Sequence, residues 1–190
     1  MTSSRPYLIA VMWVAWCVVW WLWSRNVKPD RQRESRLSRA SHIVPLALAV
    51  FLVAAPRLPG RVLDARFLPP SPFLFWSGLA LLAAGLLFSV WARAYLGRNW
   101  SGVVTIKEDH ELVRSGPYRY VRHPIYSGLL LAFVGTAVAQ DRWRGLVAVA
   151  IAFAAFWMKA RIEERWLTQT FGDQYAKYRR EVAALVPLLL

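Results

Sequence analysis

The residues best suited to chemistry lie in two short segments in the C-terminal half of the chain. The first is residues 111–128, ELVRSGPYRYVRHPIYSG, which gathers one histidine, three tyrosines and two prolines. The second is residues 159–167, KARIEERWL. On a helix, Lys159 and Glu163 are i,i+4 neighbours and share one face. Imidazole, phenol, carboxylate and ammonium groups together could bind a polar ligand with aromatic, acidic and basic parts.

The dipeptide His123-Pro124 has a specific mechanical consequence. A residue before proline avoids the α region, so we expect His123 to be extended. Pro124 can then open a helix at its first turn. This places the imidazole and the adjoining backbone amides at a helix N-terminus, which favours an anionic or carboxylate group. The alternative is that His123 only caps the helix.

Glu163 and Glu164 follow an apolar run and stand among basic residues. Ionisable groups near bilayer depth are costly and tend to be functional. The alternative is a solvated helix end joined by ion pairs. A nucleoside bearing an amino acid would satisfy the stacking, carboxylate-binding and acidic features together. No GxGxxG follows a strand, which excludes a Rossmann-type site. The single cysteine and the spacing of the histidines predict no metal centre.

The segments that position these residues are apolar. Hydrophobic residues make up 57% of the 190, and there are 11 Trp. This composition predicts an all-α integral membrane protein with about five transmembrane helices. The expected spans are residues 7–23, 43–55, 73–91, 125–139 and 146–158, the last continuing as a helix to residue 167. We expect a single membrane domain over 1–190, with three variable spans in 1–91 and a core in 92–190 that has two spans and a cytoplasmic tail. The C-terminal half of the chain would form a pocket at the cytoplasmic face.

Details of the spans refine this prediction. Residues 7–23 could also be a signal peptide, but they lack a small-residue cleavage site. We interpret Trp20, Trp21 and Trp23 as an interfacial belt. In the third span Gly78, Ala84 and Gly85 would allow close helix packing.

The charge pattern predicts how the chain sits in the membrane. The net charge of +13 favours anionic lipid headgroups rather than nucleic acid, because the basic residues cluster between apolar runs. Residues 24–42, 92–124 and 159–190 each hold six Lys or Arg, whereas 1–6, 56–72 and 140–145 hold one, three and two. This bias predicts an external N-terminus and a cytoplasmic C-terminus, with 24–42 as a solvated cytoplasmic loop. If the chain is bacterial, the membrane is the inner or plasma membrane.

Residues 110–128 and 163–182 (EERWLTQTFGDQYAKYRREV) together resemble the isoprenylcysteine carboxyl methyltransferase family, membrane enzymes related to phospholipid methyltransferases. The resemblance covers roughly residues 98–187. It implies S-adenosyl-L-methionine as the methyl donor. By matching motif positions, it implies these cofactor-binding residues: Thr105, His110, Glu111, Leu112, Val113, Tyr118, His123, Pro124, Ile125, Tyr126 and Glu163.

The substrate half of the site departs from the family pattern. Four residues before Glu163 the family carries an arginine linked to the substrate carboxylate, and this chain has Lys159, with Arg161 two residues on. Lysine keeps the charge but loses the bidentate fork. Arg161 lies about 200° around the helix from Lys159. The resemblance thus implies Lys159 and Glu163 as catalytic residues, and Lys159 with Arg161 as substrate-binding residues.

The implied reaction is carboxyl O-methylation of an isoprenylcysteine-like lipophilic or prenylated substrate. A carboxylate is ionised at pH 7 and needs no general base. Three alternatives remain open. They are phospholipid N-methylation, which requires a base, an NADPH-dependent reductase of sterol-like substrates, and a non-catalytic membrane protein that binds lipids or a partner.

Overall fold

The computed structural model describes residues 5–59, 62–108 and 111–187, and nearly all of its regular structure is helical. Four helices are long and apolar enough to cross a membrane: α1 (Arg5–Ser24), α2 (Arg36–Ala54), α3 (Pro72–Leu96) and α5 (Trp143–Phe171). The apolar helix α4 (Pro124–Gln140) has 17 residues, at the lower end of the roughly 17–25 that span a bilayer. The predicted all-α membrane fold with about five spans is confirmed.

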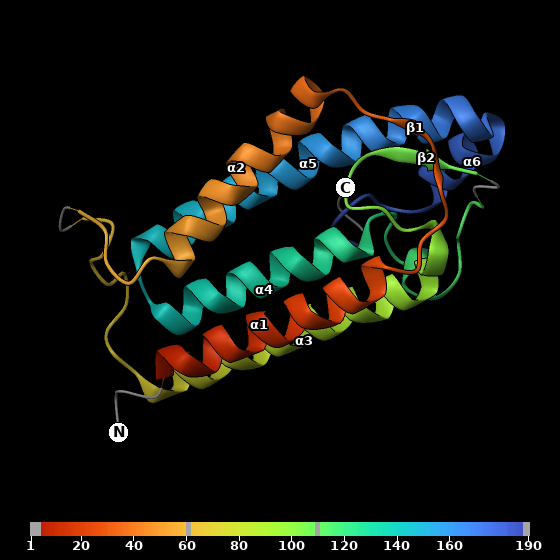
Figure 1. Ribbon diagram of the computed structural model, residues 1–190. Coiled ribbons are helices and arrows are strands. Elements are labelled where there is room, and N and C mark those ends of the chain that lie inside the picture. Colours follow the sequence, from red (N-terminus) through yellow and green to blue (C-terminus); the bar gives the residue numbers. More distant parts are fainter. Residues whose placement is uncertain (1–4, 60–61, 109–110, 188–190) are drawn as a thin grey trace.

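The remaining elements gather at one end of the helical bundle (Figure 1). They are the strands β1 (Asp30–Arg33) and β2 (Thr105–Lys107), which pair antiparallel, the short turns η1 (Gly97–Asn99) and η2 (Gly116–Arg119), and helix α6 (Asp173–Glu181). The described parts of the α2–α3 connection, 55–59 and 62–71, and the turn between α4 and α5 lie at the opposite end (Figure 1). The irregular backbone that could carry a polar site is therefore concentrated at one end of the spans.

Helices α3 and α4 pack closely because glycines face one another across their interface. A Cβ atom added at Gly78 would meet the backbone of Gly135 and Ala139, and one added at Gly85 would meet the backbone of Gly128. The predicted role of Gly78 and Gly85 is confirmed. Ala84 is exposed instead, because it lies about 100° around the helix from Gly85.

Helix α1 is held to this pair by two indole groups. Trp13 Nε1 donates to Thr136 Oγ1 at 3.1 Å, and Trp16 Nε1 donates to Ser89 Oγ at 2.8 Å. Within a membrane such side-chain hydrogen bonds join helices that gain little from apolar contact alone. Trp20 stacks on Trp16 with ring centroids 4.3 Å apart, so it turns toward the bundle, unlike the exposed Trp21. Trp20 thus faces the bundle, while the interfacial position of these tryptophans stays a prediction.

Helix α2 begins seven residues earlier than the apolar run predicts. Ser35 caps it by accepting a hydrogen bond from the Ser38 N–H at 3.2 Å. The first turns carry the exposed Arg36 and Arg39, whose long side chains can reach water while the helix continues. The expected loop 24–42 is therefore partly strand and partly helix. The cap at Ser35 is a local sequence signal, but it lies outside the apolar run from which this span was predicted.

Candidate active site

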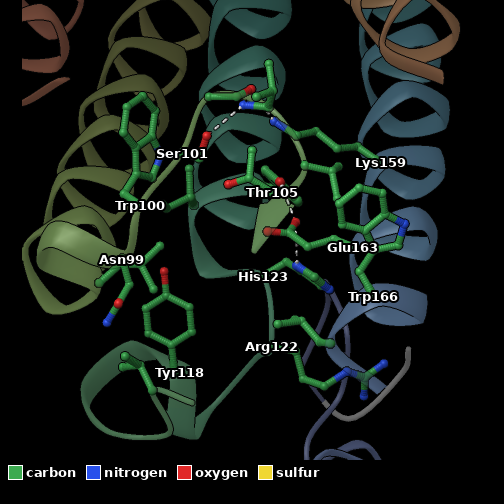
Figure 2. Close-up of a pocket in the computed structure, with 18 of the residues that line it drawn as sticks. Asn99, Trp100, Ser101, Thr105, Tyr118, Arg122, His123, Lys159, Glu163 and Trp166 are labelled. Carbon is green, nitrogen blue, oxygen red and sulfur yellow. Dashed lines mark hydrogen bonds and ion pairs between the residues drawn. The ribbon is translucent and has the colours of Figure 1, made fainter. Parts of the chain in front are cut away.

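A cavity of about 200 Å³ lies at the end of the bundle that holds β2 and α6. Figure 2 shows Thr105, Tyr118, His123 and Glu163 around the same space, with Lys159 beside it. Ligand sites commonly enclose roughly 300–1,000 Å³. A nucleoside-sized ligand would therefore fill this cavity and extend into its open mouth.

The start of α4 places His123 at the cavity wall. His123 has φ −123° and ψ 61°, outside the helical region, and Pro124 occupies the first turn of α4. His123 therefore avoids the α region, as a residue before proline should, but it is not extended as predicted, because its ψ lies well below that of the β region. The His123 ring stacks on the Tyr126 ring at 5.4 Å with an interplanar angle of 7°. The predicted helix start at Pro124 is confirmed.

Glu163 lies across the cavity on α5 and meets both of these rings. Tyr126 Oη donates to Glu163 Oε2 at 2.7 Å, and His123 Nδ1 lies 3.7 Å from the same oxygen. The Glu163 side chain is 34% exposed, so its carboxylate keeps access to a ligand. The expected pairing of Glu163 with the histidine segment is thus present in the fold.

Glu164 has a different environment and was assigned no role from the sequence. Its Oε1 accepts from Arg122 at 2.7 Å and lies 3.2 Å from His123 Nε2, while Arg179 Nε lies 3.4 Å from Oε2. The Glu164 side chain is only 5% exposed. Ion pairs do stabilise this end of the helix, as the alternative interpretation proposed, but they are buried. Glu164 therefore joins α5 to the His123 segment and to α6.

Lys159 shares the cavity face of α5 with Glu163. Its Nζ donates to the Gly102 carbonyl at 2.8 Å and lies 5.4 Å from the Tyr126 ring centroid. Arg161 points elsewhere: it is exposed, lies 5.9 Å from the Trp157 ring, and does not line the cavity. The structure therefore brings together only one of the two expected substrate-binding cations.

Most of the other expected cofactor residues also line the cavity. In full, the expected site residues along its wall are Thr105, Glu111, Leu112, Val113, Tyr118, His123, Ile125, Tyr126, Lys159 and Glu163. Pro124 is fully buried in the first turn of α4 and does not line it. His110 lies outside the described residues.

Three polar atoms along the cavity have no hydrogen-bond partner among the described residues. They are Thr105 Oγ1, Asn99 Oδ1 and Tyr175 Oη. Tyr175 is 1% exposed, and a buried hydroxyl without a partner costs free energy unless a ligand or water satisfies it. Sequence analysis did not assign Tyr175 or Asn99 to the site. The Phe171-Gly172-x-x-Tyr175 spacing was the available signal for the tyrosine.

Two of the cavity phenols cannot serve as bases near neutral pH. Burial, with the nearby Glu163 carboxylate, raises the pKa of Tyr118 above its ordinary value. Burial, with the nearby Glu164, does the same to the pKa of Tyr175. Both hydroxyls stay protonated and can donate hydrogen bonds to a ligand.

A second, larger cavity of about 800 Å³ continues along the same helices. Trp16 lines both cavities. On α2 the lining passes from Leu46 to Val50, and on α4 from Leu129 to Phe133, one helical turn farther from the first cavity in each case. The polar site is therefore followed by a mainly apolar cavity between the membrane-spanning helices, which ends at charged residues of the opposite end of the bundle, among them Arg66, Asp141 and Arg144.

The comparison with protein families identifies the class of protein that this fold and site define. Residues 73–174 match the family described as phospholipid methyltransferase. This match covers more than half of the chain, and the chain belongs to that family. A protein-S-isoprenylcysteine O-methyltransferase B of Arabidopsis thaliana is 34% identical over 115 residues, 59% of this chain and 58% of that protein. The predicted resemblance to this group of membrane methyltransferases is confirmed.

Two further comparisons show how far the similarity to these methyltransferases extends. The solved structure of the eukaryotic intramembrane Ras methyltransferase, an isoprenylcysteine carboxyl methyltransferase, is 23% identical with a TM-score of 0.58 and covers 80% of this chain and 52% of that chain. This likeness shows the fold alone. A steroid 5-alpha-reductase of Solanum lycopersicum is 29% identical over 108 residues, which make up 57% of this chain and 40% of that protein. The chain spans about half the length of these proteins, and they do not share one activity.

Proposed function

We propose that the chain is a membrane methyltransferase that uses S-adenosyl-L-methionine to methylate the carboxylate of an isoprenylcysteine-like lipophilic substrate. The observation that carries this proposal is the arrangement of Lys159 and Glu163 on one face of α5. Glu163 faces the Tyr126 and His123 rings, and Lys159 faces the backbone carbonyl of Gly102. One face thus offers an acidic contact and a basic contact one helical turn apart.

The residues present fit this cofactor. It carries an amine, a carboxylate, ribose hydroxyls and an adenine ring, and it supplies an electrophilic methyl group when bound. Glu163 would take its cationic or hydroxyl groups, and the Tyr118 ring offers an apolar surface for the base. The unpartnered Thr105 Oγ1 and Tyr175 Oη would gain partners. Because buried polar atoms normally have hydrogen-bond partners, these two hydroxyls support binding of a polar ligand in this cavity.

The chain's own part in the reaction would be positioning. A carboxylate nucleophile is ionised at neutral pH, so no side chain has to remove a proton. Lys159 would hold this carboxylate near the donor by charge, and the helices would exclude water from the reacting atoms. Moving Lys159 Nζ from the Gly102 carbonyl to the substrate would keep one of its donors in use.

The apolar cavity supports a substrate with a hydrocarbon chain. It follows the polar cavity along α1, α2 and α4 and shares Trp16 with it. The cavity-lining part of α4 from Leu129 to Gln140 rises about 16 Å, roughly half of a hydrocarbon core about 30 Å thick. A chain of the length found in one leaflet could occupy this space while its polar end stays at Lys159.

Phospholipid N-methylation is the second candidate, because the matching family is described by that activity. An amine must lose a proton before it attacks the methyl group. Tyr118 and Tyr175 remain protonated, and Glu163 already accepts from Tyr126. These features favour the carboxylate. The acidic Glu163, which faces the cavity together with Glu111, is a feature that would favour the amine.

We also propose that the cavity opens at the cytoplasmic face, with the N-terminus outside. This orientation rests on the excess of Lys and Arg in 24–42, 92–124 and 159–190. The donor would then enter from the cytosol and the substrate from the bilayer.

Calorimetric titration of the detergent-solubilised chain with S-adenosyl-L-methionine tests the proposed cofactor. We expect saturable binding with one site per chain, and competition by S-adenosylhomocysteine. A folded chain that binds neither compound would contradict the proposal and favour a non-catalytic lipid-binding protein.

A further inference from the structure

The segment 101–106 forms one wall of the candidate active site. All six of its residues line the cavity. Two of these residues lie in different parts of the proposed site, one near the proposed substrate and one near the proposed methyl donor. Gly102 accepts from Lys159, at the proposed substrate end, whereas Thr105 presents an unpartnered hydroxyl at the proposed donor end. The position of this segment therefore affects both halves of the site.

Glu34, from the N-terminal half of the chain, holds this segment at its centre. The Glu34 N–H donates to the Val104 carbonyl at 3.0 Å. In return, the Val104 N–H donates to Glu34 Oε1 at 3.0 Å. Glu34 thus satisfies both backbone groups of Val104, a residue 70 positions away in the sequence. The β1–β2 ladder, which pairs Arg33 with Thr105, continues directly into this contact.

Glu34 is itself fixed from α2. Ser38 Oγ donates to Glu34 Oε2 at 2.9 Å, and His42 Nε2 lies 3.0 Å from Oε1. The Glu34 and His42 side chains are 1% and 2% exposed. Burial alone would raise the pKa of Glu34, but the hydrogen bonds from Val104, Ser38 and His42 hold it below its ordinary value. The group is therefore a carboxylate with its acceptor positions occupied.

A buried carboxylate is an expensive way to join two segments. Its desolvation is offset only when several hydrogen bonds satisfy it, and a fully satisfied network makes the local geometry rigid. An apolar contact could hold α2 against residues 101–106 at lower cost. The use of a carboxylate at this point favours a role in which the exact backbone position of Val104 matters.

We infer that Glu34 is a positioning residue of the active site, acting through Val104 to set Thr105 at the donor end and Gly102 beside Lys159. The inference rests on the proposed function, because it takes the cavity to be the donor and substrate site. It assigns a role in methyl transfer to the N-terminal half, outside the motifs at 110–128 and 163–182.

Two variants separate the reach of this side chain from its charge. Glu34→Gln keeps the length and an oxygen that can accept from the Val104 N–H. Glu34→Asp keeps the charge beside His42 but is one methylene too short to hold Ser38 and Val104 together. Positioning predicts that Glu34→Asp weakens the affinity for S-adenosyl-L-methionine about tenfold, the effect of losing one charged hydrogen bond. Glu34→Gln should stay within about threefold of wild type.

The experiment measures the cofactor Kd by calorimetry, together with amide hydrogen exchange at Val104, for wild type and both variants. Glu181→Gln is the matched control, since its carboxylate pairs with Arg114 away from the cavity. Faster exchange at Val104 and weaker binding in Glu34→Asp, with both near wild type in Glu34→Gln, support the inference. Wild-type affinity in Glu34→Asp, or weaker binding in Glu34→Gln than in Glu34→Asp, would overturn it.

The same experiment distinguishes failure of the inference from failure of the proposed function. If wild type binds and Glu34→Asp binds equally well, Glu34 is structural and the proposed function stands. If wild type itself does not bind the cofactor, the proposed function fails and the inference fails with it. Should Glu34→Asp not fold, Ser38→Ala removes only the hydroxyl that donates to Oε2 and leaves His42 Nε2, 3.1 Å from the same oxygen, in place. It must then raise Kd about threefold, and an unchanged Kd overturns the inference.

Discussion

Tyr126 donates a hydrogen bond of 2.7 Å to Glu163 and so joins the first turn of α4 to the C-terminal half of α5. The two residues are 37 positions apart. Their contact brings together the two motifs that carry the resemblance to membrane methyltransferases. It also orients the Glu163 carboxylate toward the cavity, because one oxygen is engaged by the phenol and the side chain remains 34% exposed.

Removing the Glu163 carboxylate should abolish cofactor binding. We expect Glu163→Ala, and likewise His123→Ala, to lose measurable calorimetric affinity for S-adenosyl-L-methionine. Tyr126→Phe should weaken binding about tenfold, since Glu163 loses one charged hydrogen bond. Glu181→Gln, an exposed carboxylate outside the cavity, should bind like wild type. Unchanged affinity in folded Glu163→Ala would contradict the assignment of Glu163 as a cofactor-binding residue.

Glu164 should matter for stability. Its carboxylate is shared by Arg122, His123 and Arg179 and is almost fully buried. Removing one partner of a buried ionic cluster typically costs about 3–5 kcal/mol. Glu164→Ala should therefore unfold at clearly lower denaturant concentration than wild type. The exposed pair removed in Glu181→Ala should cost less than about 1 kcal/mol. Equal losses of stability in the two variants would contradict the proposal that Glu164 joins α5 to the His123 segment and to α6.

The sequence was sufficient for the parts of the site that depend on local rules. The residue order at His123-Pro124 predicts the start of α4, and helical spacing predicts that Lys159 and Glu163 share a face. Apolar runs predict the spans, although α2 begins at Arg36 because a serine cap and long basic side chains extend it beyond its apolar part.

The remainder depends on contacts between distant residues. Glu34 looks like one acidic residue in a basic loop until the fold pairs it with Val104, 70 positions away. Tyr175 reaches the cavity only because the C-terminal part of the chain folds back onto the segment 118–123, where Tyr178 Oη donates to the Tyr118 carbonyl and the His123 N–H donates to the Ala184 carbonyl. The assignment of Arg161 to the substrate rested on its charge near Lys159, and the structure turns it away from the cavity.

The close approach of α3 and α4 predicts a steric effect at Gly85. A Cβ atom there would meet the backbone of Gly128 and Ala132. Forcing atoms into a packed interface typically costs about 1–3 kcal/mol. Gly85→Ala should lower the thermal midpoint in detergent, whereas Ala84→Leu, on the exposed side of the same helix, should leave it nearly unchanged. Equal midpoints for both variants would contradict this packing.

The apolar cavity predicts an effect on substrate chain length. Val50 lines the cavity on α2, and Val44 on the same helix lines neither cavity. Val50→Trp should raise KM for a long-chain prenylcysteine analogue while sparing a short-chain one, because the indole would fill the space. Val44→Trp should leave both KM values unchanged. Equal effects of Val50→Trp on the two analogues would show that the chain binds elsewhere.

The low pKa of Glu34 predicts a dependence of stability on pH. Hydrogen bonds to the carboxylate hold its pKa below the ordinary value of 4.5 despite burial. The stability that this group adds is therefore present above about pH 4.5 and is lost as the pH falls through the folded-state pKa. The difference in thermal midpoint between wild type and Glu34→Gln should hold from pH 7 to about pH 4.5 and shrink as the pH is lowered further. A difference that stays constant below pH 4.5 would indicate that ionisation of Glu34 is not linked to folding.

The central claim is carboxyl methylation of a lipophilic substrate, and a direct comparison of methyl acceptors tests it. The chain in proteoliposomes is given methyl-labelled S-adenosyl-L-methionine with a prenylcysteine analogue, phosphatidylethanolamine or a fatty acid. We predict base-labile label on the prenylcysteine carboxylate, and its loss in Lys159→Ala. Label found only on phosphatidylethanolamine, or on none of the three, would contradict the claim.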